Sequence, residues 1–200
     1  MGQGKFSCFI RTAGCSLSCR YCDTKYSQDP ERGIELTIEE IINKIPIGIS
    51  KVTLTGGEPL EQKDTVELIM ELISRGYFVS LETNGTIDLP FYNAVIENLS
   101  IVADYKLDNV FNIFPSSLTN KDYIKFVIGS VEDYEKAKEI AIKLSSETAA
   151  NIYFSPVFGK VDPLDIIENL KKDKLFFIGI NLQLHKLIYK GGKESINLLK

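Results

Sequence analysis

The sequence predicts an α/β fold, a partial, open TIM-like β/α barrel of about six or seven parallel strands. Short runs rich in β-branched and aromatic residues alternate along the chain with amphipathic helical patterns. Most of these runs end at a Gly, Pro or Asn, or at a polar cluster. The units are too few for a closed barrel of eight strands. Two hundred residues are enough for a sizeable core, and we expect a single domain over residues 1–200.

The predicted strands follow from these β-rich runs. They cover residues 8–11, 51–55, 77–82, 101–104, 123–128, 152–155 and 176–184. The first strand leads directly into a cysteine-rich loop, and the second ends at two glycines.

Helical patterns lie between the strands. Residues 37–40 have the form of a capping box and predict a helix to about Ile45. A second helix begins at residues 64–67, and its predicted buried face carries Val66, Ile69, Met70 and Ile73. Further helices are expected to begin at Pro90, to span 130–144 and to span 163–172.

Composition excludes some classes of function. The formal net charge of −4 gives no general attraction to nucleic acid. No apolar stretch approaches the length of a membrane span, and residues 1–5 lack the apolar segment of a signal peptide. We therefore expect a cytoplasmic protein that acts on a small molecule, with no nucleic-acid or membrane partner.

Three of the four cysteines form the run Cys15-x3-Cys19-x2-Cys22. A [4Fe-4S] cluster held by three thiolates keeps one iron open for a small molecule. A zinc site normally needs four ligands, but the chain offers only Cys8 and His185 besides this run. Cys8 lies in an apolar segment and is interpreted as a core thiol. Clustered cysteines without a secretory signal also argue against disulfides.

The cysteine run, with Tyr21 directly before its last member, resembles the signature of the radical S-adenosylmethionine (SAM) enzymes. In those enzymes the open iron binds the amino and carboxylate groups of SAM. Residues 55–59, Thr-Gly-Gly-Glu-Pro, resemble their Gly-Gly-Glu-Pro motif. Its glycines would let the backbone approach a ligand closely, Glu58 would offer a carboxylate to the methionine ammonium, and Pro59 would stiffen the turn. Alone, the motif would be an ordinary turn.

The loops that follow parallel strands share one end of a barrel, where active sites form. Residues 15–24, 56–59, 82–85 and 104–106 all follow predicted strands, so we expect them to meet at one edge of the sheet.

Several further segments together resemble the 7-carboxy-7-deazaguanine synthases over nearly the whole chain. They are residues 9–15, 21–24, 82–86, 155–159 and 182–186. This resemblance implies a carbon–nitrogen lyase that contracts the ring of 6-carboxy-5,6,7,8-tetrahydropterin with loss of ammonia. The product is the 7-deazapurine core used for queuosine and archaeosine. A 5′-deoxyadenosyl radical would take a hydrogen from the pterin and later return one.

The resemblance also implies roles for individual residues. Cys15, Cys19 and Cys22 would bind the cluster, and Thr24 would bind a Mg²⁺ that bridges to the substrate carboxylate. Contacts to SAM are implied for Tyr21, Cys22, Asp23, Gly57, Glu58, Asp104, Tyr105, Lys106, Ser155, Pro156, Val157 and Phe158. Contacts to the pterin are implied for Arg11, Thr55, Gln3 and Gly4. The implied partners are an electron donor such as flavodoxin or ferredoxin and a second copy of the chain, because an incomplete barrel leaves an edge to cover.

Some of these residues also have a plainer, structural interpretation. Arg11 could form a surface ion pair, Thr24 could cap a turn, and residues 84–85 could be only a tight turn. His185 is interpreted as structural. The family usually opens with Gln-Gly-Glu-Gly and a longer lead-in, whereas Gln3 stands here in place of the glutamate. We therefore expect the N-terminal part of the pterin pocket to differ.

Two other functions remain open from the sequence. A glycyl-radical-enzyme activase shares the three cysteines and a Gly-Gly-Glu-Pro type of motif, but acts on a protein backbone. A non-catalytic iron–sulfur or zinc module would bind metal without cleaving SAM. Turnover of the carboxypterin and release of 5′-deoxyadenosine separate these possibilities.

Overall fold

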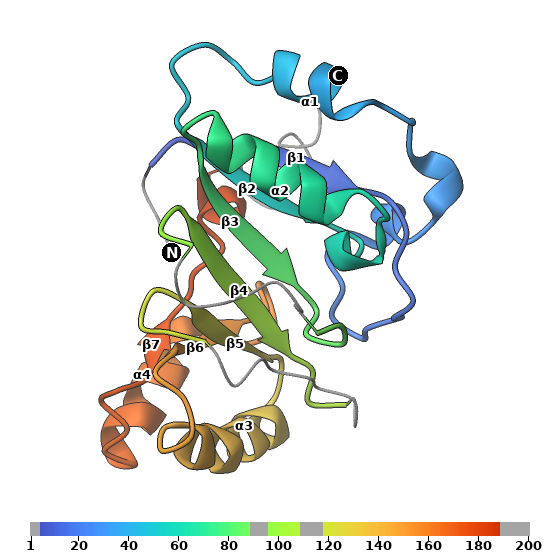
Figure 1. Ribbon diagram of the computed structural model, residues 1–200. Helices are drawn as coiled ribbons and strands as arrows, with labels where there is room; N and C mark the ends of the chain where they lie inside the picture. The colour runs from blue at the N-terminus through green and yellow to red at the C-terminus, as the bar shows by residue number, and fades with distance from the viewer. Residues whose placement is uncertain (1–4, 89–95, 109–117, 189–200) are drawn as a thin grey trace.

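The computed structural model describes residues 5–88, 96–108 and 118–188. Seven strands form one sheet in the order β1-β2-β3-β4-β5-β6-β7, and every neighbouring pair is parallel (Figure 1). This arrangement confirms the predicted fold class, an open, partial barrel. The prediction of a single domain over residues 1–200 stays a prediction.

The strands are β1 (Cys8–Thr12), β2 (Lys51–Gly56), β3 (Phe78–Thr83), β4 (Leu99–Tyr105), β5 (Tyr123–Ile128), β6 (Asn151–Pro156) and β7 (Gly179–Ile180). The α-helices are α1 (Ile38–Asn43), α2 (Thr65–Ser74), α3 (Val131–Leu144), α4 (Pro163–Lys172) and α5 (Leu184–Ile188). Short 3-10 turns form η1 (Lys25–Ser27), η2 (Pro30–Arg32) and η3 (Pro59–Glu61).

The two faces of the sheet differ in chemistry because successive strand residues point to opposite sides. One face is apolar, and its fully buried members include Leu54, Leu81, Phe126 and Phe154. Helices cover this face, with α2 against β3 and α3 against β5 (Figure 1). On the other face β2 to β4 carry Thr53, Thr55, Ser80, Glu82 and Ser100. A complete barrel fills this space with bulky apolar side chains, whereas here it is lined by polar groups.

The predicted helix starts are confirmed at α1 and α3. Thr37 forms a capping box with Glu40, whose backbone N–H donates to Thr37 Oγ1 at 3.2 Å and whose carboxylate accepts from Thr37 N at 2.8 Å. Ser130 Oγ accepts from the N–H of Asp133 at 3.2 Å. Both caps satisfy amide groups that have no partner inside the helix.

The predicted buried face of α2 is wrong by about one residue. The buried positions are Thr65, Leu68, Ile69 and Leu72, whereas Val66 and Met70 are 39% and 48% exposed. Ile73 is only partly buried. The Thr65 hydroxyl donates to the carbonyl of Pro59, which fixes the rotation of the first helical turn. The i, i+3, i+4, i+7 stripe therefore starts at Thr65.

The last predicted strand is also wrong in extent. Instead of residues 176–184, β7 spans Gly179–Ile180, and the helix α5 begins at Leu184. In the described part of the chain β7 pairs only with β6, and its last backbone bond runs from Asn181 N to Phe154 O. With no strand on its outer side, the chain leaves the sheet early. The helix predicted at Pro90 falls outside the described residues.

No helix among residues 5–88, 96–108 and 118–188 is both long and apolar enough to cross a membrane.

The position of the α2 stripe can be tested with neighbouring residues. Ile69 is fully buried and Met70 is about half exposed. We expect Ile69→Ala to lower the free energy of unfolding by about 2–5 kcal/mol, because it leaves a cavity under the helix. Met70→Ala should cost less than about 1 kcal/mol. Urea unfolding followed by circular dichroism measures both, and equal losses would contradict the assigned face.

Candidate functional site

The loops at the carboxyl ends of β1, β2 and β3 meet at one edge of the sheet, as the sequence predicted. The turn after β2 donates two backbone bonds to the segment before Cys15: Gly57 N to Thr12 O at 3.0 Å and Glu58 N to Gly14 O at 2.8 Å. Asn84, which follows β3, donates from Nδ2 toward Cys15 Sγ at 3.8 Å. The site is thus assembled from consecutive parallel strands.

The two glycines after β2 are required by close packing against the chain itself. A Cβ on Gly57 would lie 2.0 Å from the carbonyl oxygen of Gly14, and one on Gly56 would lie 2.3 Å from that of Thr12. Gly56 also has a φ of 150°, which side-chain-bearing residues rarely adopt. The sequence predicted a close approach to a ligand; the approach shown by the structure is to the start of the cysteine loop.

Glu58 is a buried carboxylate that several groups of the chain already contact. Its side chain is 0% exposed, and its carboxylate accepts three bonds from the chain: from Leu60 N at 3.0 Å, Thr83 Oγ1 at 2.8 Å and Asn84 N at 2.6 Å. Burial raises its pKa, and these three donors act in the opposite direction. A ligand ammonium would have to share a carboxylate that already holds three donors. In the structure Glu58 braces the β2 turn against the end of β3, and its contact to the methionine ammonium stays a prediction.

The cysteine loop carries three free thiols that are each partly buried. Backbone bonds from Cys15 N to Gln28 O and from Cys22 N to Cys19 O, both 3.2 Å, shape it. Burial raises the pKa of Cys15 and of Cys19. Cys8 instead packs against the hydrophobic core, as predicted.

The donor set of the cysteine loop decides which metal group it could hold. Among the described residues, no three His, Cys, Asp or Glu side chains are grouped as the ligands of one metal ion. Three free thiols from one loop fit a four-iron cluster, in which each cysteine takes a different iron.

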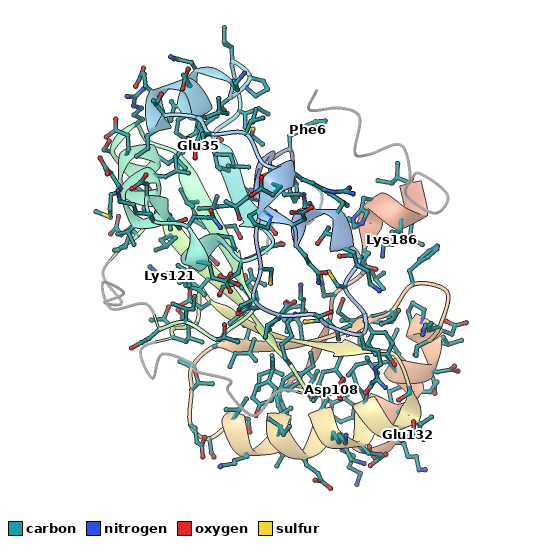
Figure 2. All side chains as sticks on the ribbon, turned by 90° about the vertical axis from the view of Figure 1, so that its right-hand side faces the viewer. Phe6, Glu35, Asp108, Lys121, Glu132 and Lys186 are labelled. Carbon is teal, nitrogen blue, oxygen red and sulfur yellow. The ribbon has the colours of Figure 1, made fainter. Side chains whose placement is uncertain are left out.

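The residues after Cys22 contact the end of the described chain. Asp23 Oδ2 accepts from Gln183 Nε2 at 2.8 Å and lies 3.4 Å from Lys186 Nζ. Figure 2 shows Lys186 on α5 beside the cysteine loop. Thr24 is the N-cap residue of η1, but its hydroxyl makes no capping bond. The plainer interpretation of Thr24 therefore applies to its backbone, while its hydroxyl forms a weak hydrogen bond with Cys22 Sγ at 3.9 Å.

A partly buried charge network lies where β4 meets β5. Asp104 binds two ammonium groups, Lys106 Nζ at Oδ2 and Lys125 Nζ at Oδ1, both at 2.8 Å. Burial alone would raise the pKa of Asp104, but these two cations hold it below its usual value. The Asp104 carboxylate in turn raises the pKa of Lys106 and of Lys125, against the effect of their burial. Sequence reasoning missed Lys125, which faces Asp104 through the β4–β5 register.

The pterin contacts expected on β1 and β2 are neighbours in the sheet. Arg11 pairs in register with Thr55, whose hydroxyl donates to Glu82 Oε2 at 3.0 Å. Arg11 lies 6.0 Å from the ring centroid of Tyr26, and among the described residues no carboxylate forms an ion pair with it. Its predicted alternative, a surface ion pair, is therefore not seen there. Gln3 and Gly4 lie outside the described residues.

The other residues predicted to contact SAM differ in how far they are buried. Ser155 donates from Oγ to the carbonyl of Asn181 at 3.1 Å, and Val157 N donates to Ile128 O at 2.8 Å. Pro156 is buried and Phe158 is 45% exposed. The Tyr105 ring stacks on Phe126 at 5.0 Å between centroids, so it packs into the apolar core. Residues 84–85 do form a turn, with Thr86 N bonded to Asn84 Oδ1 at 2.9 Å.

Comparison with known proteins agrees with this geometry. The model of the Radical SAM superfamily matches residues 9–172. The 7-carboxy-7-deazaguanine synthase of Clostridium acetobutylicum is 39% identical over 203 residues, covering 97% of this chain and 92% of that protein. The enzyme of the same name from Methanospirillum hungatei is 36% identical and covers 90% and 76%.

A solved structure has a similar fold. The crystal structure of QueE from Escherichia coli matches with a TM-score of 0.67, covering 88% of this chain and 84% of that one. At 22% identity it supports the fold alone. The two sequence relatives extend over nearly the whole chain and carry one name. The chain therefore belongs to the 7-carboxy-7-deazaguanine synthases of the radical SAM superfamily.

Proposed function

We propose that the protein converts 6-carboxy-5,6,7,8-tetrahydropterin to 7-carboxy-7-deazaguanine and ammonia in 7-deazapurine biosynthesis. Membership of the superfamily implies a [4Fe-4S] cluster and SAM. One observation carries the proposal: three free thiols lie in a loop held by the Gly-Gly-Glu-Pro turn, at the edge of a polar sheet face. When bound, the cluster and SAM would supply the radical chemistry of this family.

The chain would hold these groups from several strands. Cys15, Cys19 and Cys22 would bind the cluster. The SAM contacts would come from the β2 turn at Gly57, from Asp104 and Lys106 after β4, and from residues 155–158 after β6. The paired charges of Asp104 support this assignment, because a carboxylate fixed by two ammonium groups can orient a hydroxyl or amine donor of the cofactor.

Arg11 and Thr55 would bind the pterin. They lie side by side in the β1–β2 register, and Thr55 is already bonded to Glu82. A guanidinium matches a carboxylate in a bidentate arrangement, so Arg11 would hold the substrate carboxylate. The hydroxyl of Thr24, which lies 3.9 Å from Cys22 Sγ, would help to hold Mg²⁺ beside that carboxylate, since this ion binds hard oxygen ligands and retains waters.

An electron donor such as flavodoxin or ferredoxin would reduce the cluster. A second protein partner would be another copy of the chain, which would cover an open edge of the sheet. In the described chain β1 pairs only with β2, and Phe6 and Phe9 beside that edge are 90% and 45% exposed. Exposed aromatic rings along an unpaired strand support association through this edge. Light scattering after size exclusion measures the oligomeric state, and a monomer would contradict the dimer.

The first test is an anaerobic assay. Reconstituted protein with dithionite, SAM, Mg²⁺ and the carboxypterin should release 7-carboxy-7-deazaguanine, detected by mass. Cys19→Ala should bind far less iron and give no product, because one thiolate ligand is lost. Cys8→Ala is the matched control and should keep its iron, since Cys8 packs against the core. Release of 5′-deoxyadenosine without product would contradict the carboxypterin as the substrate. An unchanged iron content in Cys19→Ala would contradict the assignment of Cys19 as a cluster ligand.

The proposed Mg²⁺ ligand can be tested by an isosteric change. Thr24→Val removes the hydroxyl and should raise the Mg²⁺ concentration for half-maximal rate by about tenfold or more. Thr24→Ser retains the hydroxyl and should behave like the unaltered protein. A Mg²⁺ titration of product formation measures the shift. The same midpoint in all three proteins would remove Thr24 from the metal site.

Lys125→Met removes one of the two cations that hold Asp104. We expect SAM to bind about tenfold more weakly, because the carboxylate loses a charge-assisted partner that fixes its orientation. Lys143→Met on α3 is the control, since this lysine is 74% exposed and away from Asp104. Equilibrium binding of SAM to the reconstituted proteins measures the effect. Unchanged affinity in Lys125→Met would show that Lys125 does not act on the cofactor.

A further inference from the structure

Asp133 is a buried carboxylate that the function described so far does not use. It lies in the first turn of α3 and is 3% exposed. Its Oδ2 accepts from the N–H of Gly129 at 3.0 Å, and its Oδ1 accepts from Arg20 Nη2 at 2.8 Å. A buried carboxylate is costly unless it is paired. Here the partner is Arg20, which lies between two cysteines of the cluster loop.

A second contact joins the same two segments. The Tyr21 ring packs against the backbone of Gly129 so closely that a Cβ there would lie 2.2 Å from Tyr21 Cζ. Arg20 and Lys160 lie near this ring, with the Arg20 guanidinium carbon and the Lys160 ammonium 4.4 and 4.9 Å from its centroid. The Arg20–Tyr21 segment is therefore attached to the turn between β5 and α3 by an ion pair and by a ring contact.

Asp133 makes more hydrogen bonds than the start of α3 requires. The Ser130 hydroxyl already caps the N–H of Asp133, and one carboxylate oxygen is enough to bind Gly129. The other oxygen is directed to Arg20. Arg20 also lies 3.7 Å from Asp108, but that carboxylate is 61% exposed, so this second pair adds little. Figure 2 shows Asp108 above α3, whose first turn Glu132 marks.

We propose that Asp133 is a positioning residue for the cluster: through Arg20 it fixes the segment between Cys19 and Cys22 relative to β5. Asp133 touches no thiol itself. The remainder of the loop is held independently, by backbone hydrogen bonds from Gly14 N to Ser27 O and from Cys15 N to Gln28 O. Without the Asp133–Arg20 bond, Cys19 and Cys22 would shift relative to Cys15. This inference rests on the proposed function only in taking these thiols as the cluster ligands.

The test compares Arg20→Gln and Asp133→Asn with Asp173→Asn. Asp173 is a matched control, because its carboxylate also binds α3, through Tyr134 Oη and Lys138 Nζ at 3.0 Å each, and neither of these partners belongs to the cysteine loop. The first readout is the rate at which an iron chelator removes iron from the anaerobic holoprotein. The second is amide hydrogen exchange of residues 15–24 in the cluster-free protein.

We expect iron loss and loop exchange to rise about fivefold in Arg20→Gln and Asp133→Asn, the effect of losing one charge-assisted bond. The double variant should add little, because both changes break the same bond. Asp173→Asn should leave both rates unchanged. Unaltered rates in Arg20→Gln would overturn the proposal, and this variant decides even if Asp133→Asn does not fold, because Arg20 is half exposed. If the unaltered protein takes up no iron, the proposed function fails, while loop exchange still tests the Arg20–Asp133 bond.

Discussion

The contact between the β2 turn and the end of β1 is the constraint on which the site depends. Two backbone segments lie so close that neither Gly56 nor Gly57 has room for a Cβ. The bonds from Gly57 and Glu58 to the preceding segment fix where the cysteine loop begins. From the same turn, Glu58 reaches the residues after β3, one of which lies against Cys15. Main-chain geometry, more than side-chain packing, therefore sets the direction of the loop.

The polar face of the sheet depends on paired charges. Asp104 has a lowered pKa, so its contribution to stability is present above the ordinary carboxyl pKa and is lost as pH falls through the folded value. Lys125 has a raised pKa, so its contribution is present below the ordinary ammonium pKa and is lost as pH rises through the folded value. Both groups are charged across the neutral range. The site thus keeps a fixed pattern of charge across the neutral range.

Local patterns predicted most of the fold, and long-range contacts account for what they missed. The first six strands appear close to the expected residues because each run satisfies a β pattern by itself. The end of β7 depends on the absence of an outer neighbour in the described sheet, and the rotation of α2 depends on a bond from Thr65 to Pro59. Neither fact is visible in a local window.

The candidate site also combines features that local patterns predicted with features that depend on long-range contacts. The cysteine spacing and the glycine pair are local signals, and both lie where the sequence placed them. Lys125 becomes visible only through the β4–β5 register. Asp133 lies within the helix predicted over 130–144, and only the fold brings it to Arg20. The backbone position of Glu58 was predicted, but its partners follow from the position of β3.

Because each strand pairs with the one that follows it in sequence, the sheet can grow in order as the chain leaves the ribosome. The bond between Asp23 and Gln183 is different, because it spans 160 residues. This part of the cysteine loop receives its distant partner only after Gln183 has been synthesised. Until then the nascent protein holds an unfinished loop, and the order of synthesis delays completion of the loop although most of its residues lie near the start of the sequence.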